Sequence, residues 1–252
     1  MAAGIPAATA PTTHARMPTT MRTPTTTTTS TDMRVDPRLW QLISPALPVG
    51  GYSYSQGLEL AVEQGRVHDE AGAAGWIDGL AGHALVAVDL PFMGRIHAAA
   101  CDGDVAMLEH WAQRLACTRE TAELRREDAA MATALRRLLA TLSPGCRQPA
   151  GPGAHSYPAL FACAAAHWAI PVEAALAGYL WAWCENQVAA VTRLVPLGQS
   201  SAQRVLFALG ARIPGWTQAA AARADDELGF SAPGAVIASA RHETQYTRLF
   251  RS

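Results

Sequence analysis

From residue 36 onward, apolar residues recur at intervals of three and four positions, the spacing that places them on one face of an α-helix. No stretch of five or more residues alternates between apolar and polar side chains, as a half-buried strand would. Half of the 252 residues are hydrophobic, which is enough for a sizeable core. The pattern predicts an all-α protein, a single bundle of about ten helices over residues 36–252.

Capping residues mark several expected helix starts. Asp36, which precedes a proline, and Asp104 both fit N-cap positions. The pairs Ser53–Gln56 and Ser200–Gln203 have the spacing of capping boxes. Between these starts and the proline and glycine breaks, we expect helices that include about residues 70–87, 90–101, 119–142, 171–194, 214–227 and 233–240.

Charged side chains on these helices are assigned to solvated faces and caps. The polar face of the helix over 119–142 carries Glu120, Glu123, Arg126 and Glu127. Glu59 and Glu63 lie one turn apart near His68, and such a carboxylate pair usually faces water; a di-metal or acid–base role is the alternative. Asp89 is interpreted as a helix cap.

The helix over 171–194 is the most hydrophobic of the chain. Its uncharged run ends after 11 residues at Glu185, whereas a membrane span needs about 20, so we predict a buried central helix and no membrane insertion. Polar groups buried in such a helix need partners. Glu185, Asn186 and Gln187 either bind Arg193 or the C-terminal residues, or line an internal polar passage.

Two segments differ in composition from the helical part. Residues 1–35 are rich in threonine and proline and have few large apolar groups, so we predict a disordered tail, with a transit peptide as the alternative. Residues 143–157 are rich in proline and glycine, and we interpret them as a long connection inside one domain over 36–252.

The basic residues limit the possible activities. All 20 residues of types Lys and Arg are arginine, and a Walker A loop and Schiff-base catalysis both need lysine. A net charge of −1 argues against a nucleic-acid binder, which needs a strongly basic face. Five cysteines without a Cys-x-x-Cys pair, and no secretory signal, predict a cytoplasmic protein with reduced thiols.

Two cysteine–histidine pairs are candidate metal ligands. His97 and Cys101, and likewise Cys163 and His167, lie one turn apart on expected helices. Together they would form a Cys₂His₂ set for a metal-binding carrier. Cysteine is also a common small core residue, and this interpretation is favoured.

Residues 241–252, which we name the C-terminal segment, are dense in arginine and aromatic side chains. These types are enriched where proteins bind one another. Chain ends usually fray, so a segment of this composition is expected to dock. The residues alone leave open whether it docks onto its own core or onto a partner.

Several motifs together resemble the urease accessory protein F family. They cover nearly all of the chain from about residue 39 onward. The matching stretches are the run Leu42–Glu59 (LISPALPVGGYSYSQGLE), Asp89-Leu90-Pro91, Glu185-Asn186-Gln187, Pro196-Leu197-Gly198-Gln199 with Gln203, and Ser239 with the C-terminal segment.

The resemblance implies an all-α, dimeric, cytoplasmic chaperone without enzymatic activity. Such proteins join accessory proteins D and G, of which G is the GTPase, on the urease apoprotein, and the assembly inserts nickel; no cofactor is bound tightly. The segment implied to bind protein D contains Arg241, His242, Glu243, Gln245, Tyr246, Arg248, Leu249, Phe250 and Arg251. The residues implied to face the GTPase or to line the polar passage are Tyr54, Gln56, Glu59, Glu185, Asn186, Gln187, Arg193, Gln199 and Gln203.

The chain departs from the family pattern in three places. The Thr/Pro-rich tail and the loop over 143–157 match no family motif, and we expect both to be solvated. Relatives often carry a lysine just before the Pro-Leu-Gly-Gln motif, where this chain has Arg193. A role that needs an ammonium point charge is therefore not expected here.

Overall fold

The computed structural model describes residues 1–2, 4, 36–229 and 232–252. The chain divides into two units, Met1–Arg34 and Val35–Ser252, and the second unit contains the described helices. The segment predicted to be a disordered tail, 1–35, lies almost entirely outside the described residues.

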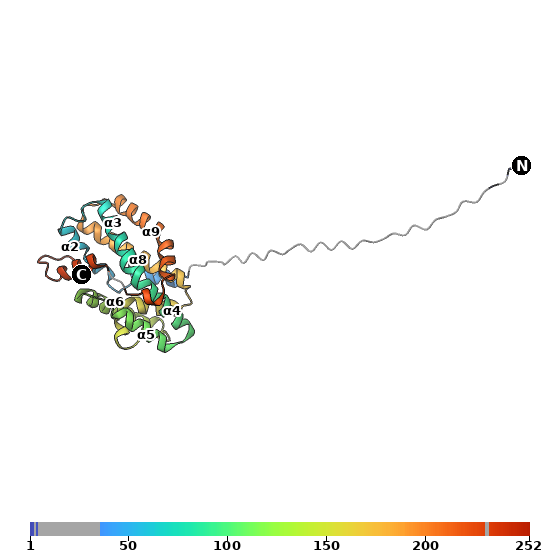
Figure 1. The fold of residues 1–252 in the computed structure, drawn as a ribbon, viewed down its shortest axis with the longest axis horizontal. Helices are drawn as coiled ribbons and strands as arrows, with labels where there is room; N and C mark the ends of the chain where they lie inside the picture. The colour runs from blue at the N-terminus through green and yellow to red at the C-terminus, as the bar shows by residue number, and fades with distance from the viewer. Residues whose placement is uncertain (3, 5–35, 230–231) are drawn as a thin grey trace. The chain divides into compact units, whose positions relative to one another are not determined.

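The second unit is a bundle of helices, and no strand occurs among the residues that the structure describes (Figure 1). The all-α prediction is confirmed. The α-helices are α1 (Pro37–Ile43), α2 (Leu58–Glu63), α3 (Glu70–Leu80), α4 (Leu90–Asp102), α5 (Val105–Ala116), α6 (Ala122–Leu142), α7 (Tyr157–His167), α8 (Val172–Leu194), α9 (Gln199–Ala221) and α10 (Pro233–His242). Between them lie the 3₁₀ turns η1 (Gly51–Ser53), η3 (Gly151–His155) and η4 (Asp225–Glu227), and the π-helix η2 (Ala81–Asp89).

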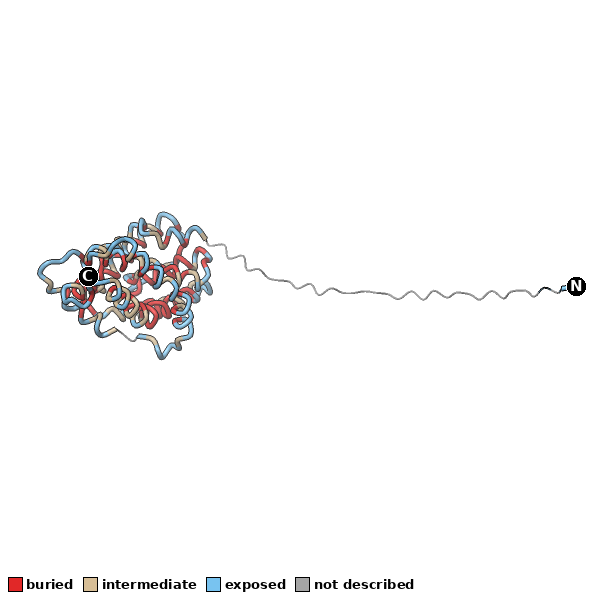
Figure 2. The backbone as a smooth tube through the Cα atoms, turned by 90° about the horizontal axis from the view of Figure 1, so that it is seen from above, coloured by how far each residue is buried: buried red, intermediate tan, exposed pale blue. Residues whose placement is uncertain are grey.

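Helix α8 is the central helix that its composition predicted. It packs against α1, α4 and α9, and Leu180 and Cys184 are fully buried. At Gly178, an added Cβ would lie 2.9 Å from Leu39 Cδ1, so the glycine allows α1 to approach closely. Figure 2 shows the buried residues gathered inside the bundle, and the exposed ones on its outer turns and loops.

Helices α3, η2 and α4 form one continuous helix from Glu70 to Asp102. The prediction of separate helices over 70–87 and 90–101 is wrong. In the π segment, the Leu90 N–H donates to the Leu85 carbonyl, five residues earlier. This wider turn offsets the carbonyl with which the Pro91 ring would otherwise clash, so the helix continues past the proline.

This long helix is also the one element that could cross a membrane by length and composition among the described residues. However, 67% of the most apolar 18-residue stretch of this helix is buried inside the domain. Such burial is the usual property of a core helix.

The predicted caps are partly confirmed. The Asp36 and Asp104 side chains accept bonds from backbone N–H groups in the first turns of α1 and α5. Both capping boxes are wrong, because α2 and α9 start after Gly57 and Gly198 without side-chain caps. The separate helix over 214–227 is wrong too, since α9 continues through Pro214.

The proline- and glycine-rich loop is docked onto the bundle and is not simply solvated. Cys146 and Ala154 are buried. Arg136 of α6 donates through Nη2 to the Ala154 carbonyl at 2.9 Å. An added Cβ at Gly153 would lie only 2.7 Å from the Ala112 Cβ of α5. The loop therefore forms part of the packed domain.

Candidate functional site

The C-terminal segment docks onto its own chain in this structure. The Arg251 N–H donates to the Ser53 carbonyl at 2.9 Å, and the Ser252 carbonyl accepts from the Ser55 and Gln56 N–H groups at 2.9 and 3.1 Å. Phe250 is buried. The end of the segment is therefore held by backbone hydrogen bonds against the residues that precede α2.

Glu59 of α2 is the main acceptor for this segment. Its carboxylate accepts from the Leu249 N–H at 2.6 Å and the Phe250 N–H at 2.9 Å. The His242 Nε2 lies 3.2 Å away. Glu59 is buried, so its assignment to a solvated face is wrong, whereas Glu63 is exposed.

Glu123 of α6 binds the same segment from the other side. Its carboxylate lies 2.9 Å from His242 Nδ1 and accepts from Arg248 Nη1 at 3.0 Å. His242 has no exposed surface. The helix expected to carry Glu123 on its polar face therefore turns this residue inward. We name Glu59, Glu123, His242 and Arg248 the anchor cluster.

Glu127, one turn further along α6, connects the segment to the central helix. It accepts from Ser252 Oγ at 2.8 Å and from Gln56 Nε2 at 2.7 Å. Gln56 Oε1 accepts in turn from the Trp183 Nε1 of α8 at 2.8 Å. Burial raises the pKa of Glu127 to about 7, although the bonds from Gln56 and Ser252 oppose this rise. The prediction that Glu127 lies on the polar face of α6 is wrong, because the residue is buried.

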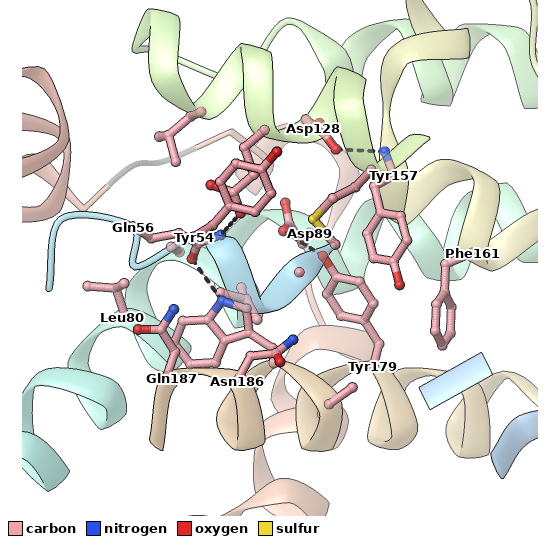
Figure 3. A pocket seen from close by; sticks show the side chains of 18 of the residues that line it. Tyr54, Gln56, Leu80, Asp89, Asp128, Tyr157, Phe161, Tyr179, Asn186 and Gln187 are labelled. Carbon is pink, nitrogen blue, oxygen red and sulfur yellow. Dashed lines mark hydrogen bonds between the residues drawn. The ribbon is translucent and has the colours of Figure 1, made fainter. Parts of the chain in front are cut away.

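A cavity of about 160 Å³ lies beside Glu127 and Gln56 (Figure 3). Tyr54, Gln56, Glu185, Asn186 and Gln187, all predicted site residues, are among its lining residues. In Figure 3, Asn186 and Gln187 extend from α8 on one side, and Asp128 and Tyr157 lie on the other.

A buried charge network forms part of the cavity wall. Arg119 lies 2.7 Å from Asp89 and 2.9 Å from Asp128. Burial alone would lower the pKa of Arg119, but the two carboxylates outweigh it and raise that pKa. Burial raises the pKa of Asp128. Asp89 makes no cap bond, so its interpretation as a helix cap is wrong.

The three polar residues of α8 line the cavity and do not bind Arg193 among the described contacts. Gln187 is buried, and its Oε1 has no hydrogen-bond partner within the described residues. Burial raises the pKa of Glu185. Arg193 lies instead over the Phe250 ring, 6.0 Å from its centroid. Whether the cavity belongs to a continuous passage stays a prediction.

The other residues predicted for this face lie apart from the cavity lining. Gln199 and Gln203 are exposed at the start of α9, beside Phe207, in a shallow depression. Phe207 is 83% exposed. It is not among the predicted site residues, because an apolar residue in a helical sequence is normally expected in the core. The structure therefore divides the predicted set between the cavity, the anchor cluster and the α9 surface.

The cysteine–histidine pairs do not form a metal set. His97 Nε2 donates to the Ile170 carbonyl at 2.9 Å, and Cys101 Sγ lies 3.7 Å from His97 Nδ1. Cys163 is buried, and burial raises the pKa of its thiol. In the described part of the chain, no three His, Cys, Asp or Glu residues are grouped so that they could hold a metal ion. The carrier interpretation gains no support.

The fold and these clusters define a class: an all-α protein whose buried charges hold a surface segment against the bundle. A family model described as UreF matches residues 67–210. A urease accessory protein UreF from Alkalilimnicola ehrlichii is 48% identical over 220 residues, which cover 85% of this chain and 95% of the relative. Relatives of the same name from Azoarcus sp. (strain BH72) and Pseudomonas putida (KT2440) are 47% and 46% identical, over 85% of this chain and 94% and 96% of their own lengths. The chain belongs to the UreF family of urease accessory proteins.

Proposed function

We propose that the protein is an adaptor in urease maturation, acting in the cytoplasm as a dimer. It joins accessory proteins D and G on the urease apoprotein while nickel is inserted, and it catalyses no reaction itself. Nickel is the cargo of the complex and not a tightly bound cofactor of this chain. Family membership supports this proposal. The absence of lysine supports a nucleotide site on the GTPase partner.

The C-terminal segment is the proposed docking surface for accessory protein D. The observation that carries this assignment is that the backbone of the segment is anchored while several of its side chains face outward. Tyr246 is fully exposed, and Leu249 is 63% exposed. Arg241, Arg248 and Arg251 are exposed as well. Tyr and Arg presented on an ordered backbone are typical hot-spot residues, because little conformational entropy is lost on binding.

The residues proposed to contact the GTPase are the exposed members of the predicted set, Arg193, Gln199 and Gln203. Tyr54, Glu59 and Gln187 are buried, so they act by supporting the surface and not by touching a partner. Phe207, exposed next to Gln203, is added to this face.

A co-purification experiment tests the docking surface. We expect Tyr246→Ala with Leu249→Ser to weaken binding of accessory protein D at least about tenfold, because both side chains are exposed hot-spot candidates. Val105→Ser, at an exposed apolar position on α5, is the matched control and should bind normally. Unchanged binding of the double variant would exclude this surface.

Point variants are needed because truncation of the C-terminal segment would change both the fold and the docking surface. Removing residues 241–252 also removes His242 and Phe250, which are buried. It would leave the Glu59 and Glu123 carboxylates without the groups that bind them. A truncated chain would therefore lose partner binding through misfolding as well as through loss of the surface.

A further inference from the structure

The contacts of His242 determine its protonation. Both ring nitrogens face carboxylate oxygens, Nδ1 facing Glu123 and Nε2 facing Glu59. Glu59 accepts two further backbone N–H bonds, and Glu123 accepts from Arg248, so both act as ionised acceptors. A neutral imidazole has one N–H and would leave a lone pair facing one of them. Both nitrogens must therefore carry hydrogen.

We propose that His242 is held as an imidazolium between Glu59 and Glu123, and that this proton positions the C-terminal segment for its partner. His242 is thus a positioning residue and does not touch the partner. The partner-binding part of this inference rests on the proposed function. The anchoring part concerns the isolated chain alone.

The charge count makes the imidazolium essential to the anchor. Two carboxylates are balanced by His242 and Arg248. The Arg248 side chain is 40% exposed, so water screens its contribution, whereas His242 is fully buried between its partners. Loss of the His242 charge leaves a buried, uncompensated carboxylate, which must reach water to be solvated.

Glu59 transmits this loss to the docking surface. The carboxylate that binds His242 also accepts from the Leu249 and Phe250 N–H groups. These two bonds hold the backbone where Phe250 is buried and Leu249 faces outward. If Glu59 turns to water, both bonds break, and the exposed side chains lose their fixed arrangement.

The charged groups around His242 are Glu59 from α2, Glu123 from α6, and Arg248 and Glu243 from the C-terminal segment. Glu243 accepts from the Glu123 N–H at 3.4 Å. Replacing His242 should therefore loosen the segment and weaken partner binding together.

Amide hydrogen exchange on the full chain tests the anchor without a partner. The readout is the exchange rate of the Leu249 and Phe250 amides, corrected for intrinsic base catalysis. We expect His242→Gln to raise both rates at least tenfold. His83→Gln, which changes an exposed histidine of η2, is the control and should leave them unchanged. Equal rates in His242→Gln and the parent protein would overturn the proposal.

A charge-rescue variant separates the proton from simple packing. His242→Gln with Glu123→Gln removes one positive and one negative charge, so it should slow exchange again by at least threefold relative to His242→Gln. If the double variant exchanges as fast as the single one, His242 acts through packing and the proposal fails. Helical circular dichroism of each variant verifies that the bundle is folded.

Failure of the proposed function gives a different result. If His242→Gln releases the segment but neither it nor Tyr246→Ala weakens binding of accessory protein D, the anchor stands and the docking assignment fails. If Tyr246→Ala weakens binding while His242→Gln leaves both exchange and binding unchanged, the docking assignment stands and the anchor fails.

Discussion

Three glutamates on two helices hold the C-terminal segment, and each is buried. Glu127 differs from the other two because it has no cationic hydrogen-bond partner: Gln56 and Ser252 are both neutral donors. Burial therefore raises its pKa from 4.5 to about 7. The folded protein then binds this proton more tightly than the unfolded chain, so its contribution to stability is full below pH 4.5 and is lost as the pH rises to about 7.

Glu127→Gln tests this linkage. A neutral amide keeps the acceptor for Gln56 and cannot ionise, so the variant should lose less stability than the parent between pH 5 and 8. The difference should reach at most about 3 kcal/mol, the energy that corresponds to the shift in pKa. Urea unfolding at both pH values measures it.

Glu120→Gln is the matched control, because Glu120 is exposed just before α6. It should follow the parent protein at both pH values. Equal pH-dependent losses in the parent and in Glu127→Gln would show that Glu127 is not the group responsible.

At the scale of elements, the docked loop between α6 and α7 is the part of the fold least evident in the sequence. Glycine and proline predicted a connection, but not that Gly153 lies against Ala112 of α5. A side chain at this glycine must displace backbone as well as a methyl group, since Ala112 C is 3.0 Å from the added Cβ. The loop at Gly153 therefore packs against α5 as closely as one helix packs against another.

Gly153→Ala should destabilise the protein by about 1–3 kcal/mol, because the loop or α5 must shift to admit the methyl group. Thermal unfolding measures the change. Gly145→Ala lies in the same loop and meets only His167 Cε1 at 3.7 Å, so it should be nearly neutral. Similar melting temperatures for both variants would show that the loop is not packed as described.

Helical periodicity predicted helices over about 119–142 and 171–194, and the structure has α6 (Ala122–Leu142) and α8 (Val172–Leu194) there, because each has a continuous apolar face. It failed at Pro91 and Pro214, where tertiary packing keeps a helix intact across a proline. The Ser53–Gln56 capping box failed because the Gln56 side chain binds Glu127 and Trp183, far away in sequence. Local spacing cannot show such competition.

The candidate site was predicted unevenly for a similar reason. The composition of residues 241–252 predicted that they dock. Their acceptors were missed, because periodicity shows which residues share a helix face but not which other segment covers that face. Glu59 and Leu249 are 190 positions apart, so no local pattern joins them.

At the scale of the whole molecule, the chain combines a packed helical bundle with two outward-facing sets of side chains. One is the anchored C-terminal segment, with Tyr246 and Leu249 exposed. The other is the start of α9, with Gln203 and Phe207. Two sets of exposed side chains on one helical domain suit an adaptor that holds two proteins at once, which is the role proposed for this member of the UreF family.

Reconstituted urease activation tests this role most directly. Purified urease apoprotein, accessory proteins D and G, GTP, magnesium and nickel are combined with this protein, and nickel bound per urease active site is measured. We predict high nickel loading with the parent protein and with Val105→Ser, and loading near the level without any adaptor for Tyr246→Ala with Leu249→Ser. Full nickel loading with the double variant, or without the protein at all, would contradict it.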